Sequence, residues 1–90
     1  MAEARESVEV VNNRGLHARA SAKFVTMASG FDAEVTVSHD GNSVTGTSIM
    51  GLMMLAAEEG AMIQIVAIGP DEAEVLSAIE KLIVEKFNED

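Results

Sequence analysis

His17 stands among residues that suit the binding of an anion. It lies where an extended segment gives way to an alanine-rich stretch, and Arg19 follows two residues later. The chain carries fifteen acidic residues but none between residues 10 and 31, whereas three of its six cations, Arg14, Arg19 and Lys23, lie there. A helix start offers unpaired backbone N–H groups and the positive end of the macrodipole. The segment therefore predicts a site for a dianion, and phosphate is the natural candidate.

The ring of His17 is suited to carry a phosphoryl group covalently. A neighbouring guanidinium and a helix N-terminus both disfavour the protonated ring, so we expect a neutral imidazole with a free lone pair. Such a ring can attack an activated phosphorus, after which Arg19 and the first helical amides can hold the phosphoryl group. The helix dipole contributes only about 0.3–1 kcal/mol at an exposed site, so the donor must supply the driving force.

Residues 15–21, GLHARAS, resemble the active-site signature of HPr, the histidine-containing phosphocarrier of the phosphotransferase system. Residues 30–35, 47–52 and 68–72 resemble further blocks of that family in the same order, so the resemblance covers the chain from about residue 7 onward. It implies that enzyme I, fed by phosphoenolpyruvate, phosphorylates Nδ1 of His17, that Arg19 is the phosphate partner, and that an enzyme IIA is the recipient.

Ala20 departs from the family, which usually has proline directly after the arginine. Proline suits a first helical turn because it fixes φ and has no N–H to satisfy. Alanine keeps the helix propensity but lacks this rigidity. We therefore expect looser phosphate geometry rather than loss of function.

Residues 49–55, IMGLMML, form an apolar run inside the uncharged segment 41–57. A chain of 90 residues has a single helical layer and cannot cover such a helix on both faces. We expect Leu52 and Leu55 to enter the core. Three residues are expected to remain partly exposed: Ile49, Met50 and Met53.

An exposed apolar patch near a charged site is typical of a protein interface, and methionine suits a surface that must fit several partners. The resemblance implies that Ile49, Met50 and Met53 help to dock enzyme I and enzyme IIA, and we extend this surface to Ala22 and Lys23. Plain core packing is the alternative for each methionine.

Ser48 has two interpretations that can both hold. A serine at a helix start ordinarily caps the backbone. Its position also matches the regulatory serine of the family, which HPr kinase/phosphorylase modifies, and a phosphate there would add negative charge beside the docking patch. The basic residue that often follows in the family is Gly51 here, which weakens the case for kinase recognition.

The composition excludes several classes of function. A net charge of −9 argues against nucleic acids and anionic membranes. The chain has no cysteine and only two histidines far apart, so we expect no metal or other cofactor. It lacks signal-peptide features, and its longest uncharged apolar stretch is too short to span a bilayer. We expect a single cytoplasmic domain, residues 1–90, that is monomeric.

The order of the expected elements predicts the fold class. Valine alternation predicts strands at residues 7–11, 34–38 and through Val44, whereas the apolar run 62–68 predicts a central strand. Asp40 and Gly41 indicate a hairpin. Helices are expected over residues 18–29, from Thr47 or Ser48 to about residue 56, and from residues 70–71 onward. The order β-α-β-β-α-β-α predicts an α+β open-faced β-sandwich, a four-stranded antiparallel sheet with three helices on one face.

Two of these helices carry more detailed predictions. In the first, Phe24, Val25 and Ala28 should face inward, and Gly30 should end it. In the last, Asp71 should cap and Glu74 should complete a capping box. Residues at helical spacing should then supply core side chains: Val75, Leu76, Ile79, Leu82, Ile83 and Phe87.

The leading hypothesis is a phosphocarrier that is not itself an enzyme, since the sequence shows no paired acid and base, nucleotide loop or metal site. The alternative is a regulatory binding module whose phosphorylation state controls a partner protein. Residues 30–35 and 87–90 look more like the nitrogen branch of the family, while sugar transport stays open. His39 is interpreted as a surface loop residue. Arg14 is either a solvated cation or support for phosphorylated His17.

Overall fold

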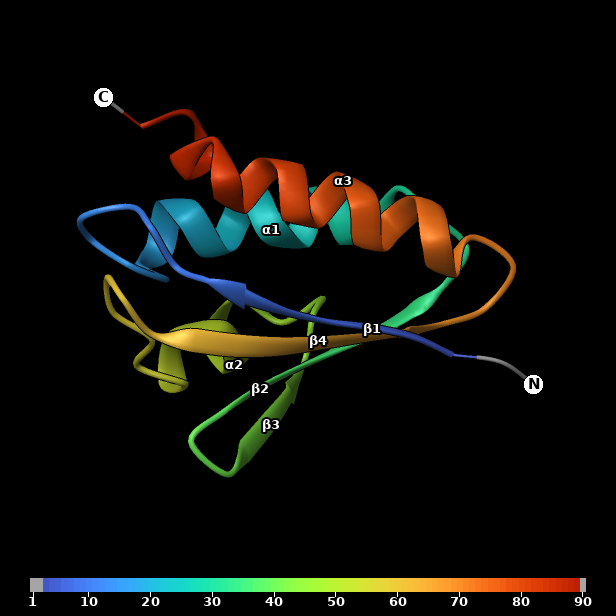
Figure 1. Ribbon diagram of the computed structural model, residues 1–90, viewed down its shortest axis with the longest axis horizontal. Coiled ribbons are helices and arrows are strands. Elements are labelled where there is room, and N and C mark those ends of the chain that lie inside the picture. Colours follow the sequence, from blue (N-terminus) through green and yellow to red (C-terminus); the bar gives the residue numbers. More distant parts are fainter. Residues whose placement is uncertain (1–2, 90) are drawn as a thin grey trace.

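The computed structural model describes residues 3–89, so Met1 and Ala2 of the first segment and Asp90 of the acidic end lie outside the described residues. The elements follow one another in the predicted order (Figure 1). Their bounds are β1 (Ala4–Glu9), α1 (Ala18–Ser29), β2 (Glu34–His39), β3 (Asn42–Thr45), α2 (Ile49–Met54), β4 (Met62–Ile68), α3 (Glu72–Val84) and a short 3₁₀ turn, η1 (Lys86–Asn88).

The strands form one antiparallel sheet in the order β1-β4-β2-β3. The apolar strand β4 therefore lies inside the sheet between β1 and β2, as its sequence predicts. Ile63 and Ile65 of β4 pair with Val8 of β1 and Val37 of β2 respectively, and all four side chains are buried. These alternate positions give the sheet one apolar face.

The helices cover that apolar face. Figure 1 shows α1 and α3 side by side along the sheet, and α2 packs against α1. Phe24 of α1, Leu52 of α2 and Ile79 of α3 are fully buried and belong to the same cluster as the inward side chains of the strands. This arrangement confirms the predicted α+β open-faced sandwich. Among the described residues, no helix combines the length and apolarity needed to cross a bilayer.

Strand β1 begins and ends earlier than the predicted range of residues 7–11. Its extent is fixed by pairing with β4. This pairing begins at Ala4, which lies opposite Ala67. Val10 is buried as expected, but its N–H donates to the carbonyl of Ala61, and its own carbonyl accepts from the N–H of Gly60, both at 2.8 Å. Valine alternation thus predicted correctly that Val8 and Val10 are buried. The strand nevertheless ends at Glu9, and Val10 belongs to the loop that follows.

The predicted capping box at the start of α3 is wrong. Asp71 is the N-cap residue, yet its side chain makes no cap bond to α3. Its Oδ2 instead accepts from the backbone N–H of Asp32 at 2.8 Å, which ties the start of α3 to the loop before β2. Glu74 is exposed. The Asp71 carboxylate thus binds a backbone N–H from a distant loop instead of the N–H groups of its own helix.

The end of α3 also differs from the helical spacing of its core residues. The helix ends at Val84, and Phe87 lies in the following turn with φ +55°. The ring of Phe87 is nevertheless fully buried, as are Ile79 and Ile83 within the helix. The prediction that Phe87 belongs to the core is therefore confirmed, although a left-handed turn rather than the helix delivers it there.

The β2–β3 connection confirms the predicted hairpin. Asp40 and Gly41 have φ values of +52° and +84°, and a two-residue type I′ turn needs positive φ at both positions. His39, interpreted from the sequence as a loop residue, is the last residue of β2. Its Nδ1 donates to the carbonyl of Met62 at 3.1 Å, because a carbonyl can only accept.

Candidate functional site

His17 is the N-cap residue of α1. Its backbone is extended, with φ −75° and ψ 179°, and its carbonyl accepts the N–H of Ser21 at 2.8 Å. Its ring Nδ1 accepts the N–H of Arg19 at 3.2 Å, where serine or aspartate oxygens usually serve. A backbone N–H can only donate, so Nδ1 carries a lone pair that points at the start of the helix.

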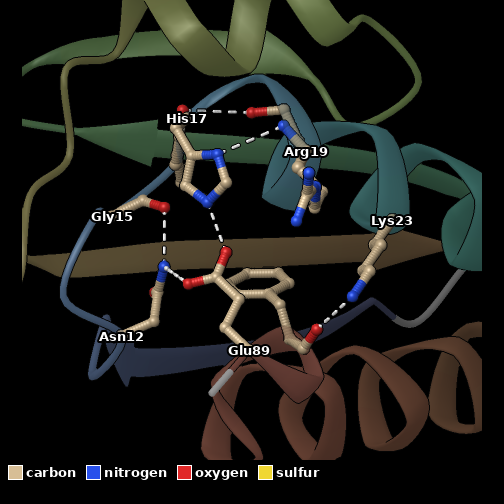
Figure 2. Close-up of polar contacts among 9 residues, drawn as sticks. Asn12, Gly15, His17, Arg19, Lys23 and Glu89 are labelled. Carbon is tan, nitrogen blue, oxygen red and sulfur yellow. Dashed lines mark hydrogen bonds and ion pairs between the residues drawn. The ribbon is translucent and has the colours of Figure 1, made fainter.

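The other ring nitrogen faces a carboxylate. Figure 2 shows Nε2 of His17 paired with Oε2 of Glu89, while Oε1 of Glu89 accepts from Nδ2 of Asn12 at 3.2 Å. The sequence missed both Asn12 and Glu89, and it predicted a site without acidic residues. Glu89 lies 72 positions along the chain from His17, so no local signal could have found it.

The C-terminal turn brings Glu89 to the site. Lys86, Phe87 and Asn88 have φ values of +57°, +55° and +59°, which reverse the chain after α3. The buried ring of Phe87 anchors this turn, and Lys23 of α1 donates to the Phe87 carbonyl at 2.5 Å. The Glu89 carboxylate therefore lies only two residues after Phe87, whose position is fixed by these contacts.

The loop before α1 is held on its other side. Gly15 has φ +63°, and its carbonyl accepts from Nδ2 of Asn12 at 2.8 Å. The N–H of Leu16 donates to the carbonyl of Ala57, just after α2, at 3.0 Å. Leu16 and Asn12 are both buried. The backbone that presents His17 is thus fixed by the core and by the segment after α2.

A cleft of about 530 Å³ opens beside the ring. Its lining includes Asn12, Asn13, Arg14, His17, Arg19, Lys23, Lys86, Asn88 and Glu89. Four of these residues are cationic and one is a carboxylate. The excess of positive charge and the free amides of α1 make the cleft suited to a dianion.

The environment of Glu89 keeps its carboxylate ionised. Burial by itself raises the pKa of Glu89, but hydrogen bonds from His17 and Asn12, together with the positive charge of Arg14, outweigh burial. The pKa of Glu89 therefore lies below its ordinary value of 4.5. In the folded protein, Glu89 therefore prefers the charged form more strongly than an isolated glutamate does.

This shift predicts a pH-dependent contribution to stability. Because the pKa of Glu89 is lower in the folded protein, its contribution is fully present above the ordinary value of 4.5 and is lost as the pH falls through the folded value. The free-energy difference between wild type and Glu89→Gln should be constant near neutral pH and shrink below about pH 4.5. Urea unfolding measured between pH 7 and pH 3 would test this. A difference that grows with acid would contradict it.

The predicted phosphate partner Arg19 and the predicted docking residues Ala22 and Lys23 all lie on α1. Arg19 is exposed in the first turn and lines the cleft with His17. Ala22 and Lys23 lie further along the helix and line a neighbouring, more apolar hollow of about 500 Å³ that Arg19 also borders. The structure thus brings Arg19, Ala22 and Lys23 together at this hollow, and Arg19 and Lys23 also line the cleft beside His17.

The predicted residues of the second region lie on α2. Ser48 is its N-cap, and the Ser48 Oγ accepts from the N–H of Gly51 at 2.9 Å, which confirms the capping interpretation. Ile49, Met50 and Met53 are 40%, 66% and 38% exposed, whereas Leu52 and Leu55 are buried, as expected. The sequence missed Met54, which at 77% is the most exposed of this helix.

Comparison with known proteins identifies the family of this chain. The family model described as "PTS HPr component phosphorylation site" matches residues 4–85. Phosphocarrier protein HPr of Neisseria meningitidis serogroup A is 49% identical over 85 residues, which cover 94% of this chain and 96% of that protein. Phosphocarrier protein NPr of Escherichia coli K12 is 38% identical over 87 residues, covering 96% and 97%.

Solved structures agree with the fold. HPr-C-His from Thermoanaerobacter tengcongensis gives a TM-score of 0.90 at 40% identity and covers 100% of this chain and 99% of its own. HPr from Bacillus anthracis gives 0.88 at 38% identity, covering 92% and 99%. The resemblance of the sequence motifs is therefore confirmed, and the chain belongs to the HPr family of phosphocarrier proteins of the phosphotransferase system.

Proposed function

We propose that this protein accepts a phosphoryl group on Nδ1 of His17 from phosphorylated enzyme I, whose donor is phosphoenolpyruvate, and passes the group to an enzyme IIA in the cytoplasm. The observation that carries the proposal is the lone pair of Nδ1 at the start of α1, beside a cleft lined by four cations. Membership of a phosphocarrier family whose model describes a phosphorylation site supports the carrier role.

The local chemistry requires little rearrangement. The Nδ1 lone pair attacks phosphorus as the donor's bond to phosphorus breaks, and the backbone N–H of Arg19 passes from the ring to a phosphoryl oxygen. The guanidiniums of Arg19 and Arg14 are available for charge-assisted contacts with the dianion. The chain offers one nucleophile and an anion cradle, so we propose that the partner proteins, rather than this one, provide turnover.

Labelling tests this proposal directly. The protein should take up phosphate from phosphoenolpyruvate when a matching enzyme I is present, and the label should be acid-labile and stable to base. Mass spectrometry should place it on His17, and ³¹P–¹⁵N NMR should place it on Nδ1. Absence of uptake, or a label on any other residue, would contradict the proposed role.

The docking surface that we propose spans two adjacent helices. Ala22 and Lys23 on α1 and Ile49, Met50 and Met53 on α2 would contact enzyme I and enzyme IIA. Support comes from the packing of α2 against α1 and from the exposure of the three α2 side chains. Methionine can adapt its shape to both partners.

We also propose Ser48 as the target of HPr kinase/phosphorylase. A phosphate on Ser48 would add about −1.5 to −2 charge at the start of α2, next to exposed Ile49 and Met50. It should weaken docking of apolar or acidic partner surfaces. The Oγ that accepts the N–H of Gly51 is the atom that would be modified, so the cap would pass to the phosphate oxygens.

A second candidate function is regulatory binding, in which the state of His17 controls a partner protein by direct contact. The 38% identity to a protein named NPr supports a nitrogen-branch role as an alternative to sugar transport. Pull-downs with phosphorylated and unphosphorylated protein separate the two. Recovery of membrane permease components alone would defeat the regulatory candidate.

Restoring the family's usual proline tests how Ala20 affects the site. Ala20 is the third residue of α1, ahead of the first intrahelical bond from Ser21, so its N–H is not needed by the helix. Ala20→Pro should stabilise the protein by about 0.4–1 kcal/mol and tighten the phosphate geometry. Chemical denaturation and phosphotransfer kinetics would measure the two effects. Unchanged transfer rates would show that residue 20 is kinetically irrelevant.

A further inference from the structure

We propose that Glu89 is a positioning residue for phosphoryl transfer, whose carboxylate holds the proton on Nε2 of His17 so that Nδ1 keeps its lone pair. The inference rests on the proposed role of His17 as phosphoacceptor. It assigns a task to Glu89 in the C-terminal turn, in addition to the core packing of Phe87 in that turn.

The contacts at the two ring nitrogens impose one tautomer. The N–H of Arg19 can only donate, so Nδ1 must be unprotonated. The ionised carboxylate of Glu89 can only accept, so Nε2 must carry the proton. The two contacts act in the same sense, and the nitrogen left with a lone pair is the one at the helix start.

The carboxylate is itself held in place. Nδ2 of Asn12 donates to its Oε1 at 3.2 Å, and the same Nδ2 donates to the carbonyl of Gly15 at 2.8 Å. Asn12 is only 1% exposed, and the side chains of His17 and Glu89 are 23% and 17% exposed. A charge-assisted bond in such a partly dehydrated place is stronger than one in open solvent.

The same proton matters after transfer. Attack by Nδ1 forms the new P–N bond as the donor's bond to phosphorus breaks, and the ring, still protonated on Nε2, becomes formally cationic beside the Glu89 carboxylate. When the phosphoryl group passes on, the P–N bond breaks, its electron pair returns to Nδ1, and a neutral imidazole leaves. Without the Nε2 proton the leaving group would be an imidazolate anion, which is much poorer.

The other charges around the ring have the opposite sign. Arg14 lines the cleft beside the ring from the loop before α1, Arg19 and Lys23 line it from α1, and Lys86 lines it from the C-terminal turn. All four favour the phosphoryl dianion, and none of them can accept the proton of Nε2. Among the charged residues described around the cleft, Glu89 alone favours the protonated Nε2.

Glu89→Gln tests the proposal because it removes the charge while keeping the shape. Glu85→Gln is the matched control. Glu85 is exposed at the end of α3, and its substitution changes the net charge by the same amount. In unphosphorylated protein, ¹⁵N NMR of the His17 ring should show Nε2–H in wild type and in Glu85→Gln. In Glu89→Gln the Nδ1–H form should become detectable.

Transfer kinetics provide the second readout. Wild type, Glu85→Gln and Glu89→Gln are phosphorylated with enzyme I, and the rate of transfer to an enzyme IIA is followed across pH. Glu89→Gln should transfer about tenfold more slowly at neutral pH, the size expected from a lost charge-assisted bond. Its rate should also decline at lower pH than wild type, because the phosphorylated ring would lose its Nε2 proton sooner.

Two results would overturn the role of Glu89: the same His17 tautomer in Glu89→Gln as in wild type, or superimposable pH–rate profiles for the two proteins. A failure of the proposed function looks different. In that case wild type takes no label on His17, whereas the tautomer comparison on unphosphorylated protein still reports on Glu89.

Discussion

Replacing His17 with alanine is expected to reduce uptake of phosphoryl label from phosphoenolpyruvate and enzyme I to background. The substitution removes the only ring whose nitrogen meets both the start of a helix and the cationic cleft among the described residues. Helix, loop and docking surfaces remain in place, because the His17 ring is partly exposed and not part of the core. Autoradiography after gel separation measures the loss.

Two controls separate chemistry from structure. His17→Ala also removes the N-cap of α1, which costs about 0.5–2 kcal/mol of stability. His17→Asn restores a good cap without a nucleophile, so it should be folded and equally unlabelled. His39→Ala removes the other histidine and should label like wild type. Labelling of His17→Asn would show that the acceptor lies elsewhere.

Gly15→Ala is expected to give the second large effect. A Cβ at Gly15 would stand 2.2 Å from the carbonyl oxygen of Ala57 and 2.8 Å from the Cα of Glu58, and φ is +63°. Both neighbours are backbone atoms and cannot turn away. Left-handed strain of about 1–2 kcal/mol and overpacking of about 1–3 kcal/mol together predict a loss of about 2–5 kcal/mol.

The same substitution should also impair phosphoryl uptake. Relief of the clash requires the loop to move off Ala57, which breaks the bond from the N–H of Leu16 and displaces His17 from the start of α1. Urea unfolding and labelling rates would measure the two effects together.

Gly41→Ala is the control for Gly15→Ala. Gly41 has φ +84°, but nothing lies within 4 Å of a Cβ built there. It should lose only the strain of about 1–2 kcal/mol and label normally. Equal destabilisation of the two variants would show that the contact with Ala57 has no role.

The sequence by itself determined the elements whose signals are local. The first helix runs over Ala18–Ser29 as predicted, because alanine-rich composition, one apolar stripe and Gly30 all agree over that span. The strand Met62–Ile68 is central, as its nearly continuous apolar run predicts, because such a run is best covered by neighbouring strands on both edges and by helices on one face. The nucleophile and its cations were also readable, since they lie within one short segment.

Only the tertiary structure decided which distant groups meet. Asp71 binds the N–H of Asp32 rather than its own helix, and Glu89 reaches His17 through a left-handed turn after Val84. Such pairings depend on how the chain reverses after each element. Periodicity describes which face of a helix or strand is buried, but it contains no information about which residue from another part of the chain will stand opposite a given side chain.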